Sequence, residues 1–413
     1  MKRFIYIIVA AAAVLSAASC SKPQPAEPNP QPTEKKTIVA YFFGRDLSYY
    51  FSLNLASMER AVASGKLGDN AVMVFVQTSS TDAEIRRMSY DNKSQKCVTE
   101  VLESIELPSA LTSAGFAEYM KKTMDYAPAE SYSVIFLGHA RAWLPKTPLA
   151  SPATYSLMQR FVPSFEKMPG AAVTRDLGEN NVTLDMDELA EGLISTGVKF
   201  DCLYFDVCFM SSLEAAYELR KTADWIIASP CEIMGEGSPY DRILVPLFNG
   251  DYKVVCDEYV SFYESYDYPS GCIAAIECSK LEAVAGTVKK INALPAAEGF
   301  DAANVQTYEG RTSGRYAGHW FYDAEDYFRQ ICADSGLVSE FSSRLDECVH
   351  YRGHTESFFS AYNSRFNEIK YYSGISLTPD EKCIGTMKES ADRDMLEYYN
   401  PSLRQTAWYK ATH

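Results

Sequence analysis

From Thr37 onward, short apolar runs of strand length alternate with stretches in which apolar residues recur at helical spacing. This alternation is typical of β-α-β units and of a largely parallel sheet. We predict strands at residues 37–43, 71–77, 132–137, 201–206 and 225–229, and helices at residues 53–63, 113–126, 184–193 and 211–221. Polar and apolar residues alternate over 84–103, which predicts a hairpin at the edge of the sheet. The sequence therefore predicts an α/β fold.

The N-terminus has the features of an export signal. Met1, Lys2 and Arg3 precede an apolar stretch over residues 4–15, which is typical of a secretory signal peptide and too short for a mature spanning helix. Small residues then lead to Cys20, and this pattern resembles the cleavage and lipidation site of bacterial lipoproteins. We interpret residues 1–20 as a lipoprotein signal peptide with Cys20 as the lipidated mature N-terminus. Ordinary signal cleavage, with an incidental Cys20, is the alternative.

Residues 21–36 (SKPQPAEPNPQPTEKK) are rich in proline and have no apolar periodicity, so we expect a semi-rigid tether rather than a packed element. No later stretch approaches the roughly 18 uninterrupted apolar residues of a spanning helix. We predict an exported protein that is anchored by lipid to a bacterial envelope membrane, at the periplasmic or the cell-surface face. The remainder divides into one large α/β domain over residues 37–247 and an α/β extension over residues 248–413 on the same sheet.

Charge and cysteine spacing exclude several other classes of protein. The formal net charge is -15, with 39 Lys and Arg against 54 Asp and Glu, and this negative field repels phosphate backbones and disfavours a nucleic-acid partner. Apart from Cys20, the cysteines are irregularly spaced and include no C-x-x-C pair. Several of them lie in apolar strand-like runs, where a thiol behaves as a small core residue. We therefore predict neither a disulfide framework nor a zinc site.

A histidine and a cysteine follow two of the predicted strands. The strand at residues 132–137 leads directly into Gly138 and His139, and the strand at residues 201–206 ends just before Cys208. Loops beyond the carboxyl ends of parallel strands form the ligand crevice of such sheets. A Cys-His pair there can act as nucleophile and base, and a helix beginning at residue 211 would favour the thiolate. The alternative is a packed cysteine and an ordinary loop histidine.

Four short segments carry a resemblance to a known family: Gly138-His139 with Trp143, residues 205–210 (FDVCFM), residues 228–232 (ASPCE) and residues 235–240 (GEGSPY). Together they resemble the clostripain family of cysteine peptidases, closely over residues 37–247 and more thinly beyond. The resemblance implies a caspase-like, three-layer α/β/α sandwich with a mostly parallel central sheet. It also implies a catalytic dyad of His139 and Cys208 that cleaves protein or peptide substrates after Arg or Lys.

The resemblance also implies roles for neighbouring residues. Asp206, two positions before the cysteine, matches the acidic residue of the pocket for a basic side chain, where a carboxylate would bind guanidinium or ammonium. A capping or turn role for Asp206 is the alternative. Backbone N–H groups of Gly138 and Ala140 would hold the oxyanion. Ala140 replaces the glycine usual in the family and Val207 replaces a small residue, so a catalytically degenerate, lipid-anchored homologue that binds peptides or proteins is the alternative function.

The long stretch between the dyad residues contains basic side chains. Processing in this region is a habit of the family, so the resemblance implies self-cleavage at Lys146, Arg160, Lys167 or Arg175. The alternative is that these four are solvated loop charges. Some relatives depend on calcium, and acidic and amide residues are close together at Asp176, Glu179, Asn180, Asn181, Asp185 and Asp187. Their spacing is not that of an EF-hand loop, so we assign no metal and no cofactor, and calcium stays an open expectation.

Overall fold

A nine-stranded sheet runs through the part of the chain that the computed structural model describes, residues 32–44, 47–146, 184–309, 319–363, 365–387 and 390–413. Its strand order is β10-β8-β7-β6-β5-β1-β2-β3-β4. The five consecutive strands β7, β6, β5, β1 and β2 pair in parallel, and the strand pairs toward both edges are antiparallel. The strands are β1 (Glu34–Phe42), β2 (Asn70–Gln77), β3 (Asp82–Asp91), β4 (Lys96–Glu106), β5 (Ala129–Leu137), β6 (Phe200–Asp206), β7 (Ala223–Ala228), β8 (Cys272–Glu277) and β10 (Val349–His354).

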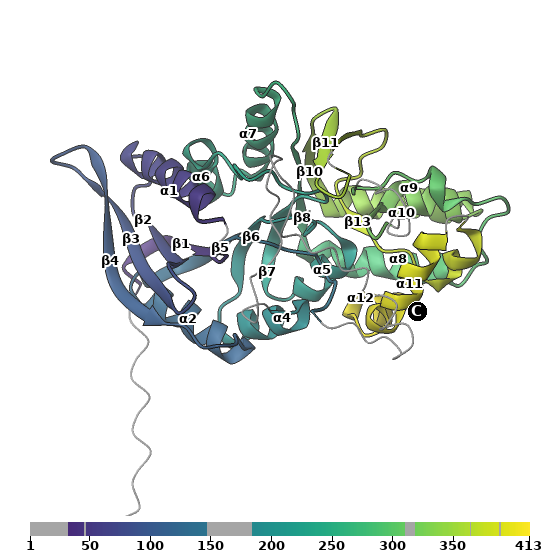
Figure 1. Ribbon diagram of the computed structural model, residues 1–413, viewed down its shortest axis with the longest axis horizontal. Coiled ribbons are helices and arrows are strands. Elements are labelled where there is room, and N and C mark those ends of the chain that lie inside the picture. The colour runs from purple at the N-terminus through teal and green to yellow at the C-terminus, as the bar shows by residue number, and fades with distance from the viewer. Residues whose placement is uncertain (1–31, 45–46, 147–183, 310–318, 364, 388–389) are drawn as a thin grey trace, which may run out of the picture. The chain divides into compact units, whose positions relative to one another are not determined.

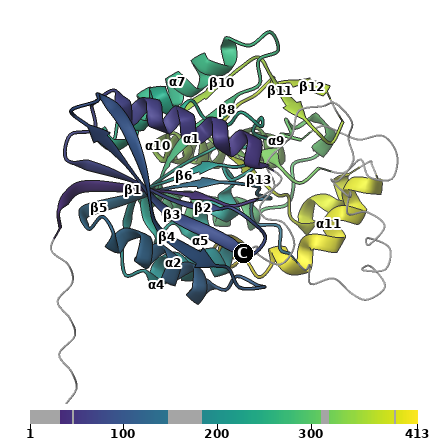
Figure 2. The same ribbon diagram turned by 60° about the vertical axis from the view of Figure 1, so that its left-hand side comes forward.

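Helices cover both faces of this sheet, as Figures 1 and 2 show. One face packs against α1 (Ser48–Ala63), α6 (Tyr240–Asn249) and α7 (Tyr252–Glu264), and the other packs against α2 (Ser113–Asp125), α4 (Met186–Ser195), α5 (Leu213–Leu219) and α8 (Leu281–Asn292). The central strands are buried on both faces because helices lie above and below them. This arrangement confirms the predicted three-layer α/β/α sandwich with a mostly parallel sheet.

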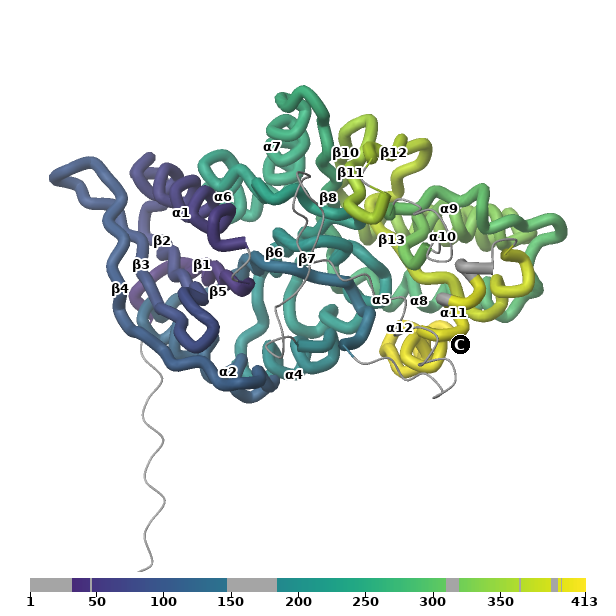
Figure 3. The backbone as a smooth tube through the Cα atoms, in the orientation of Figure 1, coloured from purple at the N-terminus to yellow at the C-terminus, as the bar shows by residue number. Residues whose placement is uncertain are grey.

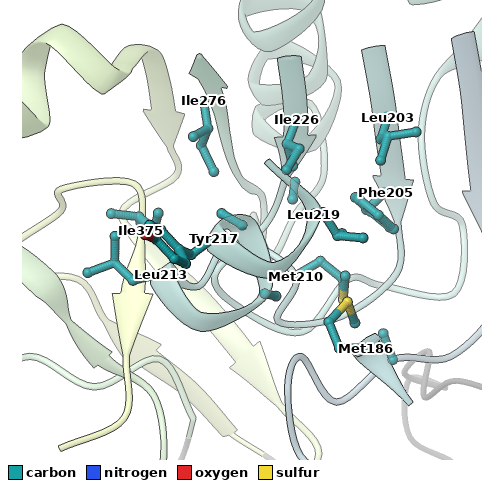
Figure 4. Close-up of a cluster of buried hydrophobic side chains, with 14 of the residues drawn as sticks. Met186, Leu203, Phe205, Met210, Leu213, Tyr217, Leu219, Ile226, Ile276 and Ile375 are labelled. Atoms are coloured by element: carbon teal, nitrogen blue, oxygen red, sulfur yellow. The ribbon is translucent and has the colours of Figure 1, made fainter. Parts of the chain in front are cut away.

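The apolar core on the second face shows how the sequence pattern produces these layers. Figure 4 shows Leu203 and Phe205 of β6 and Ile226 of β7 in one apolar cluster with Tyr217 and Leu219 of α5. Alternate residues of a strand face the same side, so the continuous apolar run of β6 supplies side chains to both helical layers. The hairpin expected at the sheet edge is present as β3 and β4.

The chain after α7 contributes β8 and β10 to the same sheet and then forms smaller elements beside it, which Figure 3 traces. They are η2 (Cys278–Lys280), η3 (Ala302–Asn304), β9 (Tyr322–Asp323), α9 (Ala324–Ile331), α10 (Ser335–Cys348), β11 (Ser357–Ser360), β12 (Arg365–Glu368), β13 (Ser376–Leu377), η4 (Glu381–Thr386), α11 (Ser390–Leu403) and α12 (Ala407–Thr412). Within the described residues, no helix is long and apolar enough to span a membrane.

Candidate active site

Strand register brings the predicted histidine and cysteine to the same edge of the sheet. β5 and β6 are neighbouring parallel strands, and Leu137 pairs with Asp206 at their carboxyl ends. His139 and Cys208 each follow two residues beyond this pair. Neighbouring strands lie roughly 5 Å apart, so the two loops leave the sheet side by side. The prediction that both residues belong to one sheet edge agrees with this register.

The backbone next to His139 needs a glycine for steric reasons. Gly138 has a φ of +156°, and a Cβ atom at this position would lie 2.3 Å from the carbonyl oxygen of Phe43. The end of β5 therefore packs closely against the residue that follows β1. Ala140 is completely buried and is not among the residues with positive φ, so alanine fits where the family usually has glycine. The replacement of that glycine does not strain the loop.

The loop that carries Cys208 is held in an uncommon conformation. Phe209 has a φ of +61°, which is rare for a residue with a side chain and costs roughly 1 kcal/mol or more. Its N–H donates to the carbonyl oxygen of Cys231 at 3.1 Å, and its ring stacks on Phe321 with the ring centres 4.7 Å apart. These contacts compensate for the strain and fix the direction of the Cys208 side chain.

The immediate environment of the Cys208 sulfur differs from the expectation of a helix N-terminus. Helix α5 begins at Leu213 with Ser212 as its cap, later than the sequence predicts, so four residues separate Cys208 from the helix. The field of a helix falls off within its first turn. Because of this separation, the prediction that the helix favours the Cys208 thiolate is wrong. Instead, the N–H of Ile233 donates to the sulfur at 3.3 Å. The Cys208 thiol in turn lies 4.0 Å from the carbonyl oxygen of Ile233, so the same residue meets the sulfur with a donor and an acceptor.

Asp206 is completely buried at the end of β6. Its Oδ2 atom accepts a hydrogen bond from the N–H of Ser238 at 3.0 Å and another from the hydroxyl of Tyr240 at 2.6 Å. Both donors belong to the 235–240 segment, more than thirty residues further along the chain. These contacts tie two distant segments together, whereas a local turn or helix cap would bond to the next few residues. They fix the orientation of a carboxylate next to the cysteine loop.

An aromatic cluster connects both loops to the C-terminal part of the chain. Trp143 lies in the cluster with Cys208 and donates from Nε1 to the Thr378 hydroxyl at 2.8 Å. Sequence reasoning missed the distant members of this cluster, because nothing in their local pattern refers to a site. They are Tyr308, Trp320, Phe321, Phe358, Tyr362, Tyr398 and Tyr399. The extension therefore supplies part of the wall of the site.

Two buried carboxylates next to the cysteine loop were also missed. Glu232 accepts from the N–H of Ala361 at 3.1 Å, and Glu309 accepts from the N–H of Phe321 at 2.9 Å. Burial raises the pKa of Glu309 to about 8, and the charge of Glu232 acts in the same direction. Glu232 directly precedes Ile233, so its hydrogen bond to Ala361 anchors the segment that contacts Cys208.

The remaining predicted residues fall into two groups. Lys146 is described: its Nζ pairs with Glu188 at 2.6 Å and its N–H donates to Asp185 at 2.7 Å. Asp185 and Asp187 lie at the start of α4. The others lie outside the described residues: Cys20, Arg160, Lys167, Arg175, Asp176, Glu179, Asn180 and Asn181. In the described part of the chain, no three His, Cys, Asp or Glu side chains come together as a metal site, and the ten cysteines form no disulfide.

The fold and the paired loops define a cysteine peptidase of the caspase-like type. Residues 40–309 match the model of the clostripain family. The chain therefore belongs to the clostripain family of cysteine peptidases, as the sequence motifs predict. No curated protein matches the sequence.

Solved structures are similar over most of the chain. A secreted cysteine protease from Bacteroides thetaiotaomicron, called iotapain, is 28% identical and has a TM-score of 0.77, covering 93% of this chain and 100% of its own. A clostripain from the same organism, in complex with the peptide inhibitor BTN-VLTK-AOMK, is 32% identical with a TM-score of 0.50, covering 57% and 97%. An inactive zymogen protease from Parabacteroides distasonis shares the fold at 22% identity and a TM-score of 0.73, covering 92% and 99%.

Proposed function

We propose that this peptidase cleaves peptide bonds after Arg or Lys, with Cys208 as nucleophile and His139 as general base and acid. The observation that carries the proposal is the Leu137–Asp206 register pair, which positions both loops at one edge of the sheet. Buried Asp206 beside the cysteine loop supports the preference for a basic side chain. The related clostripain is in complex with an inhibitor whose peptide, VLTK, ends in lysine, which also supports this preference.

In the proposed mechanism, His139 accepts the thiol proton and the Cys208 sulfur attacks the scissile carbonyl carbon. The negative oxygen that forms is held by backbone N–H groups, for which Gly138 and Ala140 are the candidates. As the C–N bond breaks, the proton passes from His139 to the leaving amine. Water, deprotonated by His139, then hydrolyses the thioester and releases the second product and the Cys208 thiol.

Access to the site requires a change in the surrounding chain. Cys208 is 2% exposed, His139 is 7% exposed, and Asp206 is not exposed at all. Side chains as little exposed as these offer a peptide little surface in the uncleaved chain. We therefore include self-cleavage at Lys146, Arg160, Lys167 or Arg175 in the proposal, as the step that opens the site.

The proposal extends to export with a lipid at Cys20, and its support is the N-terminal sequence together with the secreted relative. The partners are then peptides or proteins with basic residues and, through the lipid, the membrane. Calcium dependence is tested in the same assay as activity. The alternative to peptidase activity is that this chain is a catalytically degenerate, lipid-anchored homologue that binds peptides or proteins without cleaving them.

Fluorogenic peptides ending in Arg, Lys, Leu or Asp, assayed under reducing conditions with and without calcium, test the proposed activity. We expect turnover of the Arg and Lys peptides by the wild type, and none by Cys208→Ala or His139→Ala. Cys97→Ala is the matched control because Cys97 lies on edge strand β4, away from the site. Absence of turnover in the wild type would favour the binding homologue, and turnover by Cys208→Ala would contradict the assignment of the nucleophile.

A further inference from the structure

A cavity of about 280 Å³ lies outside the residues assigned to catalysis. It opens between the segment after His139, the first turn of α4, helix α5 and the connection from α11 to α12. We call it the acidic cavity, because its lining residues include Asp185, Asp187, Glu214 and Glu218. Trp143 and Gln405 also line it. None of His139, Asp206 and Cys208 lines it.

Glu214 is the group that most strongly indicates a ligand. It lies in the first turn of α5 and is 1% exposed. Its Oε1 atom accepts from the N–H of Thr378 at 2.7 Å, whereas its buried Oε2 atom makes no hydrogen bond within the described structure. A buried carboxylate oxygen without a donor is costly, because it has lost water and gained nothing in return. Burial accordingly raises the pKa of Glu214 to about 7.

Backbone N–H groups donate to two other carboxylates of the acidic cavity, and the charge of Lys146 also acts on Asp185. Glu218 accepts from the N–H of Ala407 at 3.1 Å, and Asp185 accepts from the N–H of Lys146 at 2.7 Å. The Lys146 ammonium itself pairs with Glu188 at 2.6 Å. Among the residues described, no Lys or Arg lines the cavity. The described lining thus holds four carboxylates and no cationic side chain, with Lys146 outside it.

The spacing of the carboxylates indicates which kind of cation fits. No three of them come close enough together to hold a metal ion in the described residues. A guanidinium group spreads five N–H donors over a plane and can reach carboxylates that are apart from one another. The Trp143 ring in the wall offers such a cation an aromatic surface.

We propose that the acidic cavity is a second cation-binding site, which takes the basic side chain of a bound peptide and is separate from the catalytic centre. Its connection to the catalytic loops is direct. Thr378 donates from its N–H to Glu214 and accepts at its hydroxyl from Trp143, four residues after His139. A cation at Glu214 thus acts on a residue that also holds the histidine loop.

Binding is measured on the full chain carrying Cys208→Ala, so that the result does not depend on turnover. The probes are agmatine, acetyl-Gly-Arg-Gly-amide and the neutral citrulline analogue of that peptide, titrated by calorimetry. The same titrations in Cys208→Ala with Asp206→Asn separate this site from a basic pocket at Asp206. Because the uncleaved Cys208→Ala chain keeps Asp206 covered, we expect the same single bound equivalent in both variants. Loss of that equivalent in the double variant would assign the binding to Asp206 and overturn the proposal.

In the double variant Cys208→Ala with Asp206→Asn, we expect the Arg peptide and agmatine to bind and the citrulline peptide not to bind. Glu214→Gln should weaken binding about tenfold, since it removes a charge-assisted hydrogen bond from a buried site. Asp187→Asn should weaken it less, and this exposed residue keeps the test valid if Glu214→Gln fails to fold. Glu191→Gln is the matched control, because it is an exposed acid on the same helix that does not line the cavity.

Three further outcomes would overturn the proposal. The first is equal affinity of the Glu214→Gln, Asp187→Asn and Glu191→Gln variants for the Arg peptide, which would mean that binding depends only on the net charge of the protein. The second is displacement of the Arg peptide by calcium chloride but not by sodium chloride of equal ionic strength, which would indicate a metal site. The third is that agmatine binds and the Arg peptide does not, which would assign the cavity to a free small cation.

Discussion

Leu137 and Asp206 occupy paired positions on neighbouring parallel strands, and this pairing sets the geometry of the site. The chain runs two residues beyond the end of each strand to the side chain that we assign to catalysis, His139 after β5 and Cys208 after β6. A shift of the register by one residue would turn every side chain of a strand to the opposite face. The proposed dyad therefore depends on the packing of β5 and β6.

Replacing Asp206 by Asn tests the basis of specificity. Loss of the charge removes a charge-assisted hydrogen bond to the basic side chain, so kcat/KM for Arg and Lys peptides should fall about 10- to 100-fold. Asp224→Asn is the control, since Asp224 is exposed at the opposite end of neighbouring strand β7. Equal kcat/KM values in the two variants would show that Asp206 does not select the substrate.

Processing between the dyad residues is tested with the four basic positions. We expect a protein carrying Lys146→Gln, Arg160→Gln, Lys167→Gln and Arg175→Gln to remain a single chain with much lower activity, because the site stays covered. Lys253→Gln, a change at an exposed lysine on α7, should leave processing unchanged. Gel mobility and N-terminal sequencing of the fragments measure the outcome. A fully active wild type that remains intact would contradict self-activation.

Two small residues beside His139 should respond to substitution to very different extents. Gly138→Ala places a Cβ atom 2.3 Å from the Phe43 carbonyl oxygen, so we expect a loss of unfolding free energy on the order of 3 kcal/mol. Ala140→Gly relieves no strain and should cost roughly 1 kcal/mol or less. Denaturant unfolding measures both changes. An unchanged unfolding free energy in Gly138→Ala would mean that the ends of β1 and β5 are further apart than the structure shows.

Stability should fall as pH rises, in a range set by Glu309. Its pKa is about 8 in the folded protein against an ordinary value of 4.5, so from about pH 4.5 to about pH 8 the folded protein retains a proton that the unfolded chain releases. The unfolding free energy then decreases across this range, by up to several kcal/mol, and levels off above it. Glu309→Gln should remove the fall between about pH 7 and about pH 8 and reduce the slope at lower pH, where buried Glu214, with a pKa of about 7, also contributes. Glu347→Gln, at an exposed residue, should leave the curve unchanged. Chemical denaturation at several pH values provides the measurement.

Lipid attachment at Cys20 is a separate prediction. Cys20→Ala should abolish incorporation of labelled fatty acid in a bacterial host and move the protein from the membrane fraction to the soluble exported fraction. Cys97→Ala should keep both label and membrane association. Persistence of the label in Cys20→Ala would place the modification elsewhere, and absence of the label in the wild type would favour ordinary signal cleavage.

Local sequence patterns predicted the layers of the fold and the family, because strand and helix periodicity and short motifs are readable without tertiary contacts. The strands beside the site, β5 and β6, lie where the apolar runs predict them. The start of α5 was predicted two residues early, since the polar Ser211 and Ser212 resemble a helix start, and only the backbone geometry identifies Ser212 as the cap.

The sequence by itself determined the alternation of elements and the two loops with His139 and Cys208, whereas the steric need for Gly138 comes from its approach to Phe43. Only the tertiary structure decided which distant residues surround them. The Ile233 N–H at the sulfur, the Glu309 carboxylate and the Thr378 bridge between Trp143 and Glu214 come from segments far apart in the chain. Such contacts leave no local pattern, because their energy depends on burial and on a partner that only folding brings near.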